Sequence, residues 1–569
     1  MKNQIVFLLL LVLSFWGYKN PEPVITNLTY DNITQNSVTV FWSTDVPADS
    51  KVKWYSTDSN YQPVIFTDSI YYPDLVTNHS ITLSALQPGK IYKYCISSQN
   101  TSGTAADSGY FITRSLSTGN SEVYFNHTVD TTVSTGEIAK GNQNFQNLLI
   151  NRIDSSQYSI DITLWEFSDL TPVAAALINA KNRGVKIRFI YSSSPNTPLI
   201  DSIQSHGIPI LKRFYDTTYA MHNKFWIFDY RYNSNPNIKF LWTGSTNVSH
   251  PQFHSDRNNV IVIQDESLCA VYTREFEEMW GSHTDQPDSS VAKFGPAKIN
   301  NVPHILNVAD SRMEVYFSPS DSVASNLSSI ILSKTTKSVF FCILKFANLF
   351  IEDAMHNVFN NGKQIKGVFD SSHAAESNSV YPRMKGLPPN GWDPPADVFL
   401  DTLNGLLHHK YFITDANSSS GNKIVSTGSY NWETLASTNN DDNSLTIFSS
   451  RINNLYYQEF YKRYRESGGE VIAIKEYNTE LPSSSSLEQN YPNPFNSTTK
   501  IKFRIANSGT AVFEIFDILG RKIAVLINGM LQPGIYEIHY NADNLTSGIY
   551  FYKLTANNFS ITKKMLLIK

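Results

Sequence analysis

The chain has 569 residues, 41% of them hydrophobic, and a formal net charge of −4. This length predicts several domains with sizeable cores, while no strongly basic stretch points to nucleic acid and no acidic tail is present. The three cysteines, Cys95, Cys269 and Cys342, are too far apart for a zinc spacing or a disulfide framework, so we expect them to be small buried hydrophobes.

The first 18 residues are predicted to be a secretory signal peptide. Lys2 supplies a positive start, and residues 5–16 form an apolar run that is shorter than the roughly 20 residues needed to span a bilayer. The sequence contains no other long apolar run. We therefore expect a mature protein that is soluble and lies outside the cytoplasm, either secreted or at the cell surface.

Residues 21–115 are predicted to form a β-sandwich. The stretch SVTVFWS alternates apolar and polar side chains, which places Val38, Val40 and Trp42 on one face of a strand. This strand tryptophan, followed by L-x-P-G-x-x-Y at residues 86–92, resembles the fibronectin type III domain, and another small sandwich is the alternative. We assign no chemistry to this domain. The next segment, 116–121, is predicted to be a polar linker.

Residues 122–478 alternate helical and strand-like patterns, which predicts α/β layers. Within residues 122–290, a strand, a helix with a glycine stop and a buried strand follow one another from residue 159 to 192. Within residues 305–473, the same order recurs from residue 338 to 372. We therefore predict a duplicated α/β fold in which mixed sheets are flanked by helices.

One pattern occurs twice in this region. HNKFWIFD, which starts at His222, and HHKYFITD, which starts at His408, both read His-x-Lys-x4-Asp, and each is followed by a Gly-Ser-x-Asn turn. Because side chains two residues apart on an extended strand share a face, each histidine should point the same way as its lysine. The candidate residues are His222, Lys224, Asp229, Ser245 and Asn247 in the first half, and His408, Lys410, Asp415, Ser429 and Asn431 in the second.

If the two halves pair about a pseudo-twofold axis, two histidines, two lysines and two asparagines converge. Their ammonium and amide groups suit an anionic phosphate that gains negative charge in a pentacovalent transition state. One histidine would attack phosphorus and form a phosphohistidine, and the other would protonate the leaving oxygen and then deprotonate the incoming water or alcohol. We expect neither a metal nor another cofactor, since the lysines supply the positive charge.

The double motif resembles that of the phospholipase D superfamily, the group of phospholipase D-like enzymes, endonucleases and cardiolipin synthases, over residues 122–478. The resemblance implies a two-lobed α/β fold, transfer of a phosphodiester through a covalent histidine, and a monomeric catalytic unit with both half-sites in one chain. The catalytic set would be His222, Lys224, Asp229, His408, Lys410 and Asp415, with the two aspartates in structural or orienting roles. Residues that bind or support the phosphate would be Ser245, Asn247, Ser429, Asn431 and Asp442.

The resemblance also implies a carboxylate behind each histidine, 442 − 431 = 11 residues after the motif asparagine. Asp442 stands at this distance in the second half, but Asn258 stands there in the first. We therefore expect Asp442 behind His408, and Asn258 opposite His222 unless Asp256 substitutes. A carboxylate partner stabilises an imidazolium and fixes its tautomer. The family assignment makes the first-half histidine the nucleophile.

The proline-rich loop of residues 371–397 comes just before the second motif and is a candidate for the wall of the substrate entrance. In it, Tyr381, Leu387 and Trp392 either touch acyl chains or pack internally. We expect surface or loop positions for the other histidines His250, His254, His356 and His409, with His409 on the opposite side of its strand from the motif histidine.

The motif does not specify the substrate, which in the superfamily is a phospholipid, cardiolipin or a nucleic acid. Residues 121–470 carry a net charge of −6, whereas nucleic-acid sites usually carry a basic stripe. We therefore favour a secreted phosphodiesterase of the phospholipase D type that hydrolyses or transfers a phospholipid diester without a metal. The alternatives are a secreted endonuclease with the same mechanism and a non-catalytic surface adhesin, and the intact histidines argue against the adhesin.

Residues 479–487 are predicted to be a Ser-rich linker, and residues 488–569 a small C-terminal β-sandwich. The tail contains N-Y-P-N-P-F-N from Asn490, D-x-L-G-R from Asp517 and L-x-S-G-x-Y from Leu545. These motifs resemble the type A sorting domain of bacterial type IX secretion. The resemblance implies the type IX machinery as a partner and export through the periplasm and outer membrane.

Overall fold

The computed structural model describes residues 21–57, 63–192, 197–213, 220–402, 404–469, 475–477, 482–531, 533–542 and 545–569. The predicted signal peptide lies outside these residues. The chain divides into two compact units, residues 1–114 and 115–569. Across the described ranges, none of the helices combines the length and the apolar character needed to cross a membrane.

The first unit is an antiparallel β domain. Its strands are β1 (Ile25–Asp31), β2 (Val38–Thr57), β3 (Pro63–Leu83), β4 (Ile91–Gln99) and β5 (Thr104–Ile112). The sheet order is β1-β2-β4-β5, with β3 also paired to β2 and register shifts along that long pair. The predicted alternation is confirmed, because Val38, Val40 and Trp42 are buried and the Trp42 indole donates a hydrogen bond to Ser98 Oγ. The fibronectin type III assignment stays a prediction.

The second unit begins with the first α/β half. Its elements are β6 (Ser121–Phe125), η1 (Thr131–Val133), α1 (Phe145–Ser155), β7 (Ser159–Leu164), α2 (Thr171–Asn182), β8 (Lys186–Tyr191), α3 (Pro198–Ser205), β9 (Ile210–Lys212), β10 (Phe225–Phe228), η2 (Pro236–Ile238), β11 (Phe240–Gly244), α4 (His250–His254), β12 (Asn259–Gln264) and α5 (Glu266–Trp280). They form a sheet of order β6-β12-β11-β10-β7-β8-β9, in which only the β7-β8 and β8-β9 pairs are parallel. This is the mixed sheet that the sequence predicts.

The second half repeats the first. Its elements are η3 (Gly295–Ala297), β13 (Ile305–Val308), β14 (Ser311–Phe317), α6 (Val323–Lys334), β15 (Ser338–Ile343), α7 (Leu349–Asn360), β16 (Gln364–Phe369), α8 (Ser371–Ala374), α9 (Tyr381–Met384), β17 (Asp397–Leu400), β18 (Lys410–Thr414), β19 (Ile424–Gly428), α10 (Thr434–Thr438), β20 (Asn443–Phe448) and α11 (Ser450–Glu466). The sheet order is β13-β14-β20-β19-β18-β15-β16-β17. The path β20-β19-β18-β15-β16 matches β12-β11-β10-β7-β8, so the predicted duplication is confirmed.

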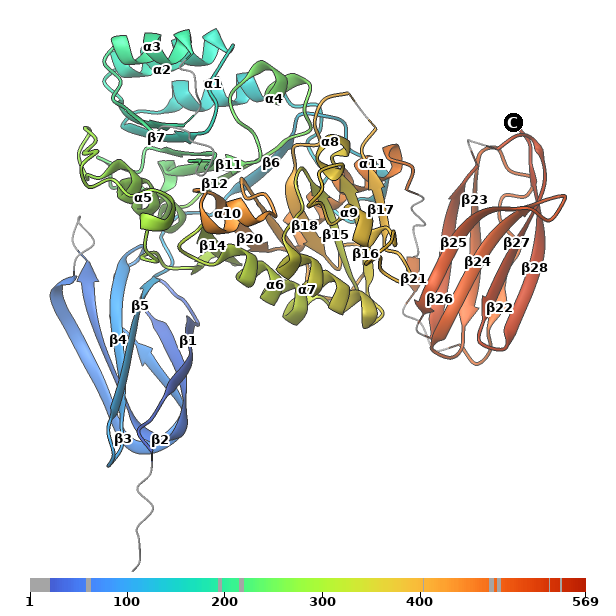
Figure 1. The fold of residues 1–569 in the computed structure, drawn as a ribbon, viewed down its shortest axis with the longest axis horizontal. Coiled ribbons are helices and arrows are strands. Elements are labelled where there is room, and N and C mark those ends of the chain that lie inside the picture. Colours follow the sequence, from blue (N-terminus) through green and yellow to red (C-terminus); the bar gives the residue numbers. More distant parts are fainter. Residues whose placement is uncertain are drawn as a thin grey trace, which may run out of the picture. The chain divides into compact units, whose positions relative to one another are not determined.

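Each sheet is covered on both faces. Helices α1, α2 and α3 pack their apolar residues on one face of the first sheet, and α6 and α7 do the same on the second (Figure 1). The other faces meet α5 and α11, most of whose side chains are buried. Helix α5 contacts its own sheet and β13 of the second half, while α11 contacts its own sheet and β6 of the first. The two halves therefore share one interior.

Two equivalent asparagines link the halves through hydrogen bonds. Asn259 accepts hydrogen bonds from Thr427 Oγ1 and Tyr456 Oη of the second half. Asn443 donates from its amide to Thr243 Oγ1 and Tyr272 Oη of the first half. Because a buried polar group needs a partner, these bonds fix how the two sheets meet. They also lie directly after the residues that contact the motif histidines.

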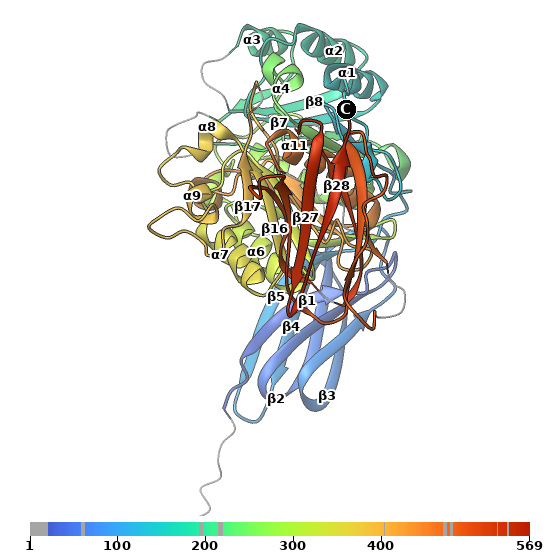
Figure 2. The ribbon, with the colours of Figure 1, turned by 90° about the vertical axis from the view of Figure 1, so that its right-hand side faces the viewer.

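The C-terminal tail is an all-antiparallel β domain with its own core. Its strands are β21 (Lys475–Tyr477), β22 (Ser486–Leu487), β23 (Thr498–Ile505), β24 (Gly509–Asp517), β25 (Lys522–Leu531), β26 (Gly534–Asn541), β27 (Gly548–Ala556) and β28 (Phe559–Leu567). One sheet has the order β21-β26-β23-β22 and the other β25-β24-β27-β28, where β27 and β28 run side by side (Figure 2). Alternating residues of β23, β24 and β27 face one apolar core, which is the pattern of a sandwich.

Candidate active site

The two motif histidines are placed by equivalent central strands. His222 and Lys224 lie in the extended segment that leads into β10, and Lys410 begins β18. The residue before each histidine forms a parallel bridge with the opposite half: Met221 pairs with Asp441, and Leu407 pairs with Arg257. These bridges bring the two histidines to the same region although they are far apart in sequence.

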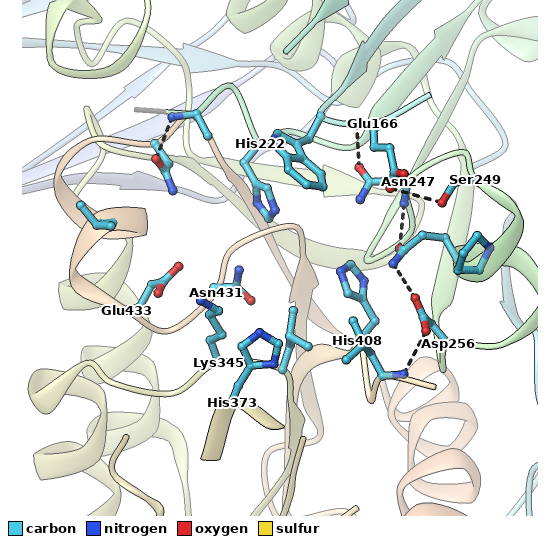
Figure 3. Close-up of a pocket in the computed structure, with 18 residues that line it drawn as sticks. Glu166, His222, Asn247, Ser249, Asp256, Lys345, His373, His408, Asn431 and Glu433 are labelled. Carbon is cyan, nitrogen blue, oxygen red and sulfur yellow. Dashed lines mark hydrogen bonds between the residues drawn. The ribbon is translucent and has the colours of Figure 1, made fainter. Parts of the chain in front are cut away.

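His222 and His408 line one cavity of about 470 Å³ (Figure 3). Residues of both halves form its wall, namely Trp165, Glu166, Ala220, His222, Asn247, Ser249, Pro251, Gln252, Asp256, Leu344, Lys345, His373, Leu406, His408, Asn431, Glu433, Leu435 and Asn440. The cavity is of the size typical for small-molecule sites, and its wall combines apolar side chains with a few convergent polar groups.

His222 has a carboxylate partner. Its Nδ1 lies 2.7 Å from Asp442 Oδ1, and Asp442 also accepts a hydrogen bond from Ser429 Oγ over 2.6 Å. Because an ionised carboxylate only accepts, Nδ1 carries the hydrogen, and the Nε2 lone pair is left for chemistry. Burial, followed by the charge of Lys224, lowers the pKa of His222 to about 4 against the opposing effect of Asp442. His222 is therefore neutral at neutral pH.

His408 has a neutral partner instead. Its Nδ1 lies 3.0 Å from Asn258 Oδ1, which also accepts from Ser245 Oγ over 2.7 Å. The Asn258 amide nitrogen donates to the Gln252 carbonyl, so the oxygen faces the histidine. Burial, followed by the charge of Lys410, lowers the pKa of His408 well below its ordinary value. An amide holds this ring in place without stabilising its protonated form.

The predicted pairing of histidines with their partners is therefore wrong in one respect. Asp442 lies behind His222 rather than His408, and Asn258 behind His408 rather than His222. Asp256 does not substitute, because its carboxylate accepts from Gln252 Nε2 and the Leu406 backbone N–H. Each partner directly precedes a strand, β12 or β20, and follows a residue that bridges to the segment before the opposite histidine, so it meets that histidine. The sequence spacing was right, but it does not say which half a partner serves.

The lysines and asparagines also take equivalent places. Lys224 Nζ donates a hydrogen bond to the carbonyl oxygen of His222, and Lys410 Nζ donates one to that of His408. Each of these bonds is 2.8 Å long. Burial lowers the pKa of Lys224 to about 7 and that of Lys410 well below its ordinary value. Asn431 lines the cavity, and its buried Oδ1 has no hydrogen-bond partner among the described residues. Such a polar atom in a cavity wall is suited to a ligand.

In each Gly-Ser-x-Asn turn, the glycine and the serine occupy positions that leave little room for larger side chains. A Cβ on Gly244 would lie 2.2 Å from the Asn259 carbonyl oxygen, and one on Gly428 would lie 2.3 Å from that of Asn443. Only glycine allows the two backbones to approach so closely. The motif serines are fully buried and orient Asn258 and Asp442, as described above, whereas Asn247 and Asn431 reach the cavity.

The motif aspartates lie at the far ends of their strands, away from the cavity wall. Asp229 accepts hydrogen bonds from the backbone N–H groups of Gln157, Tyr158 and Ser159. Asp415 makes the equivalent bonds to the three residues that lead into β15, Thr336, Lys337 and Ser338. Both carboxylates therefore tie the start of the neighbouring strand to the histidine-bearing strand, which supports the structural role expected for them.

Several residues that line the cavity are not among the candidates predicted from the sequence. Trp165 and Glu166 follow β7, and Leu344 and Lys345 stand at the equivalent place after β15. His373 follows β16 in α8, where its Nδ1 lies 2.8 Å from Asp370 Oδ1. The available signal was position, because residues just past the carboxyl ends of strands next to the histidine-bearing strand face the same edge of the sheet.

Other sequence predictions meet mixed outcomes. His409 does face away from His408, but a surface position is wrong, because it is buried between Asn259 and Glu459. Trp392 packs internally, with its indole nitrogen bonded to Glu352 and its ring stacked on His356. Of the loop of residues 371–397, only His373 lines the cavity. Within the described ranges, no group of three or more His, Cys, Asp or Glu side chains is arranged to hold a metal.

Residues 149–280 and 329–464 both match the family model described as "Cardiolipin synthase, PLD-like domain". The two matches fall on the two halves of the α/β region, and each contains one His-Lys-Asp motif. The duplicated domain of the structure is thus also a duplicated family domain. Residues 489–569 match the model "Secretion system C-terminal sorting domain".

Curated relatives match part of the chain. The mitochondrial cardiolipin hydrolase of Xenopus laevis is 27% identical over 160 residues, which are 27% of this chain and 68% of the relative. That of Drosophila melanogaster is 28% identical over 161 residues, 25% of this chain and 61% of the relative. Among solved structures, the phospholipase D family member Nuc from Salmonella typhimurium is 21% identical, with 29% of this chain and 95% of that chain covered and a TM-score of 0.22.

The sorting domain fixes the destination of the chain. A tail of this family indicates export by type IX secretion to the cell surface or the extracellular space. The tail core is separate from the apolar clusters of the two α/β halves. Recognition by the secretion machinery and the chemistry of the cavity are thus carried by different parts of the chain.

Proposed function

We propose that this chain, a phosphodiesterase of the phospholipase D superfamily with a secretion sorting tail, cleaves a phospholipid diester through a covalent intermediate on His222. The observation that carries the proposal is the pair of histidines in one cavity with unequal partners, a carboxylate on His222 and an amide on His408. A nucleophile and a proton donor need such different surroundings.

In the first step, the Nε2 lone pair of His222 attacks phosphorus as the bond from phosphorus to the leaving oxygen breaks. Positive charge develops on the imidazole, and Asp442 stabilises it. His408 donates a proton from Nε2 to the leaving oxygen. The neutral amide of Asn258 does not stabilise the protonated imidazole as a carboxylate would, so the proton leaves more readily. The bound diester is itself an anion, which raises the pKa of the nearby His408 and makes the donor form accessible.

In the second step, a water or alcohol attacks the phosphohistidine. His408, now neutral, takes the proton from the attacking hydroxyl, and the bond between phosphorus and His222 breaks. Lys224, Lys410, Asn247 and Asn431 hold the phosphate oxygens, which gain negative charge in both transition states. Since the two lysines supply the positive charge, the proposal needs no divalent metal.

The cavity wall supports a phospholipid as the substrate. Carboxylates of Glu166, Asp256 and Glu433 line the cavity, and Lys345 is the lysine among the residues that line it. Such a wall repels the neighbouring phosphates of a nucleic acid. Apolar side chains of Trp165, Leu344, Leu406 and Leu435 line the same cavity and suit the glycerol and upper acyl carbons of a lipid.

The test is turnover by the purified chain of phosphatidylcholine, cardiolipin, single-stranded DNA and a soluble chromogenic diester, all in EDTA. We expect hydrolysis of a phospholipid and of the soluble diester, and loss of both in His222→Ala and His408→Ala. DNA as the preferred substrate would replace the lipid by the endonuclease alternative. A wild-type chain that turns over none of the four would contradict the proposal and favour a binding protein.

A further inference from the structure

An exposed apolar patch lies beside the cavity in the second half. It consists of Leu349 and Phe350, the first two residues of α7, and Leu435 of α10. Phe350 is 74% exposed, Leu349 51% and Leu435 48%. Large apolar side chains gathered on a surface in this way generally mark a place where the protein meets another apolar phase.

The patch is continuous with the cavity. Leu435 belongs to it and also lines the cavity, and Glu433, just before α10, lies at the side of the cavity in Figure 3. The start of α7 is tied to α10, because Asn348 donates from its backbone to the Trp432 carbonyl and from its amide to Ser437 Oγ. Leu349 and Phe350 directly follow Asn348, so they lie at the end of α7 that is bonded to the α10 segment carrying Leu435.

The other copy of the fold has a polar residue where the second half has Phe350. Phe167 bridges Val248 and Phe346 bridges Trp432, so positions 346 − 167 = 179 apart are equivalent. The counterparts of Leu349 and Phe350 are then Leu170, which is 2% exposed, and Thr171, which is exposed and polar. The first half begins its helix with a threonine where the second half presents a phenylalanine to solvent.

We propose that Leu349, Phe350 and Leu435 insert into the surface of a phospholipid bilayer and hold the cavity mouth against it. This inference rests on the proposed phospholipid substrate, which is presented in a bilayer rather than free in solution. Burial of the three side chains among acyl chains supplies the attraction, and the continuity of the patch with Leu344 and Leu435 gives a lifted lipid an apolar path to the phosphate site.

Charge around the patch points to a bilayer with little net charge. Lys345 is paired with Glu376 over 3.3 Å, and Arg383 with Glu352 over 2.8 Å, while Asp353 in α7 is 68% exposed. These groups give no excess of positive charge to attract anionic lipids. Binding should therefore depend on apolar insertion and change little with salt.

The experiment is flotation of the full chain with phosphatidylcholine vesicles, at low and high salt, for wild type, Phe350→Thr and Leu349→Thr. Leu332→Thr is the matched control. Leu332 is an exposed leucine, 48% exposed, near the C-terminal end of α6, and it lies outside the patch, although α6 packs beside α7. Turnover of a soluble short-chain diester is measured in parallel, because the exposed Phe350 does not line the cavity.

We expect Phe350→Thr to bind vesicles roughly tenfold more weakly, the order expected for withdrawing one large apolar side chain. Leu332→Thr should bind like wild type, and soluble turnover should be unchanged in all variants. Wild-type binding by Phe350→Thr, or binding that requires anionic lipid and disappears in salt, would overturn the inference. A wild-type chain without any diesterase activity would instead refute the proposed function, and flotation would still decide the role of the patch.

Discussion

Asp442 and Asn258 make the two halves of the site unequal. They occupy equivalent positions and contact equivalent nitrogen atoms, yet one is an anion and the other a neutral amide. The buried Asp442 keeps a lowered pKa, because the effects of His222, Lys224 and Ser429 outweigh the rise that burial alone would cause. This difference between a carboxylate and an amide is the basis on which we propose His222 as the nucleophile and His408 as the proton donor.

Asp442→Asn should lower kcat/KM by at least about a hundredfold, because the developing imidazolium on His222 loses its counter-charge. The matched control is Asp441→Asn. Asp441 is the adjacent buried residue; its carboxylate contacts Lys298 and the Gly295 backbone, and only its backbone carbonyl, which the variant keeps, bonds the His222 N–H. The control should lower stability and leave the activity of the folded fraction near wild type. Equal losses in both variants, measured by steady-state kinetics, would contradict the assigned role.

The pH profile of kcat/KM should be bell-shaped. His222 has its pKa lowered to about 4, so it loses its lone pair to a proton only as pH falls through about 4. On the basic side, Lys224, whose pKa is lowered to about 7, loses its positive charge as pH rises through about 7, and His408, whose pKa is also lowered, loses the proton that it must donate. Asp442→Asn should move the acid limb to lower pH, because Asp442 is the group that raises the pKa of His222. An acid limb that stays in place would speak against this contact.

At the scale of elements, both ends of the histidine-bearing strands β10 and β18 contribute to the site. The histidine-bearing strands are held at their far ends by Asp229 and Asp415, both in the left-handed region with φ of 55° and 52°. There each carboxylate satisfies backbone N–H groups that would otherwise lie unpaired at the start of β7 or β15. These hydrogen bonds support the structural role that we predict for the two motif aspartates.

Asp229→Ala should destabilise the protein by about 3 kcal/mol, since it removes several hydrogen bonds and leaves alanine with a positive φ. Asp229→Asn should cost less, because asparagine tolerates this backbone conformation and keeps one acceptor oxygen. Urea unfolding measures the difference. The folded fraction of either variant should keep kcat within about tenfold of wild type, and a loss as large as that of His222→Ala would assign Asp229 a catalytic role.

At the scale of the whole molecule, neither half of the α/β region contains a complete site. His222 of the first half contacts Asp442 of the second, and His408 of the second half contacts Asn258 of the first. Asn259 and Asn443 cross the same interface next to these residues. The tail, in contrast, folds around its own apolar core.

Deletion of residues 489–569 should therefore separate secretion from catalysis. In a host with type IX secretion, the shortened chain should no longer reach the cell surface or the medium, because the sorting domain is absent. Its purified form should keep the kcat of the full chain on a soluble diester. Immunoblots of cell fractions and of the medium test the first statement, and export of the shortened chain at the normal level would contradict it.

Most of the architecture was predictable from the sequence, because it is encoded in local periodicity. The strand and helix order of both halves, the double motif and the tail motifs all depend on neighbours in sequence. The partner of each histidine was not predictable, since a spacing of 11 residues is the same whether Asp442 serves its own half or the other. His373 and Lys345 were missed for a similar reason, because only the folded sheet edge brings them to the cavity.

The assignment of His222 as nucleophile is tested most directly by trapping the covalent intermediate. His408→Asn is mixed with a diester whose leaving group is a nitrophenolate, which departs without a proton, so the first step proceeds while hydrolysis stalls for lack of a base. Mass spectrometry should then find the phosphoryl group on the peptide that contains His222. A phosphoryl group on His408 in the reciprocal His222→Asn chain, with none on His222 in His408→Asn, would contradict the account.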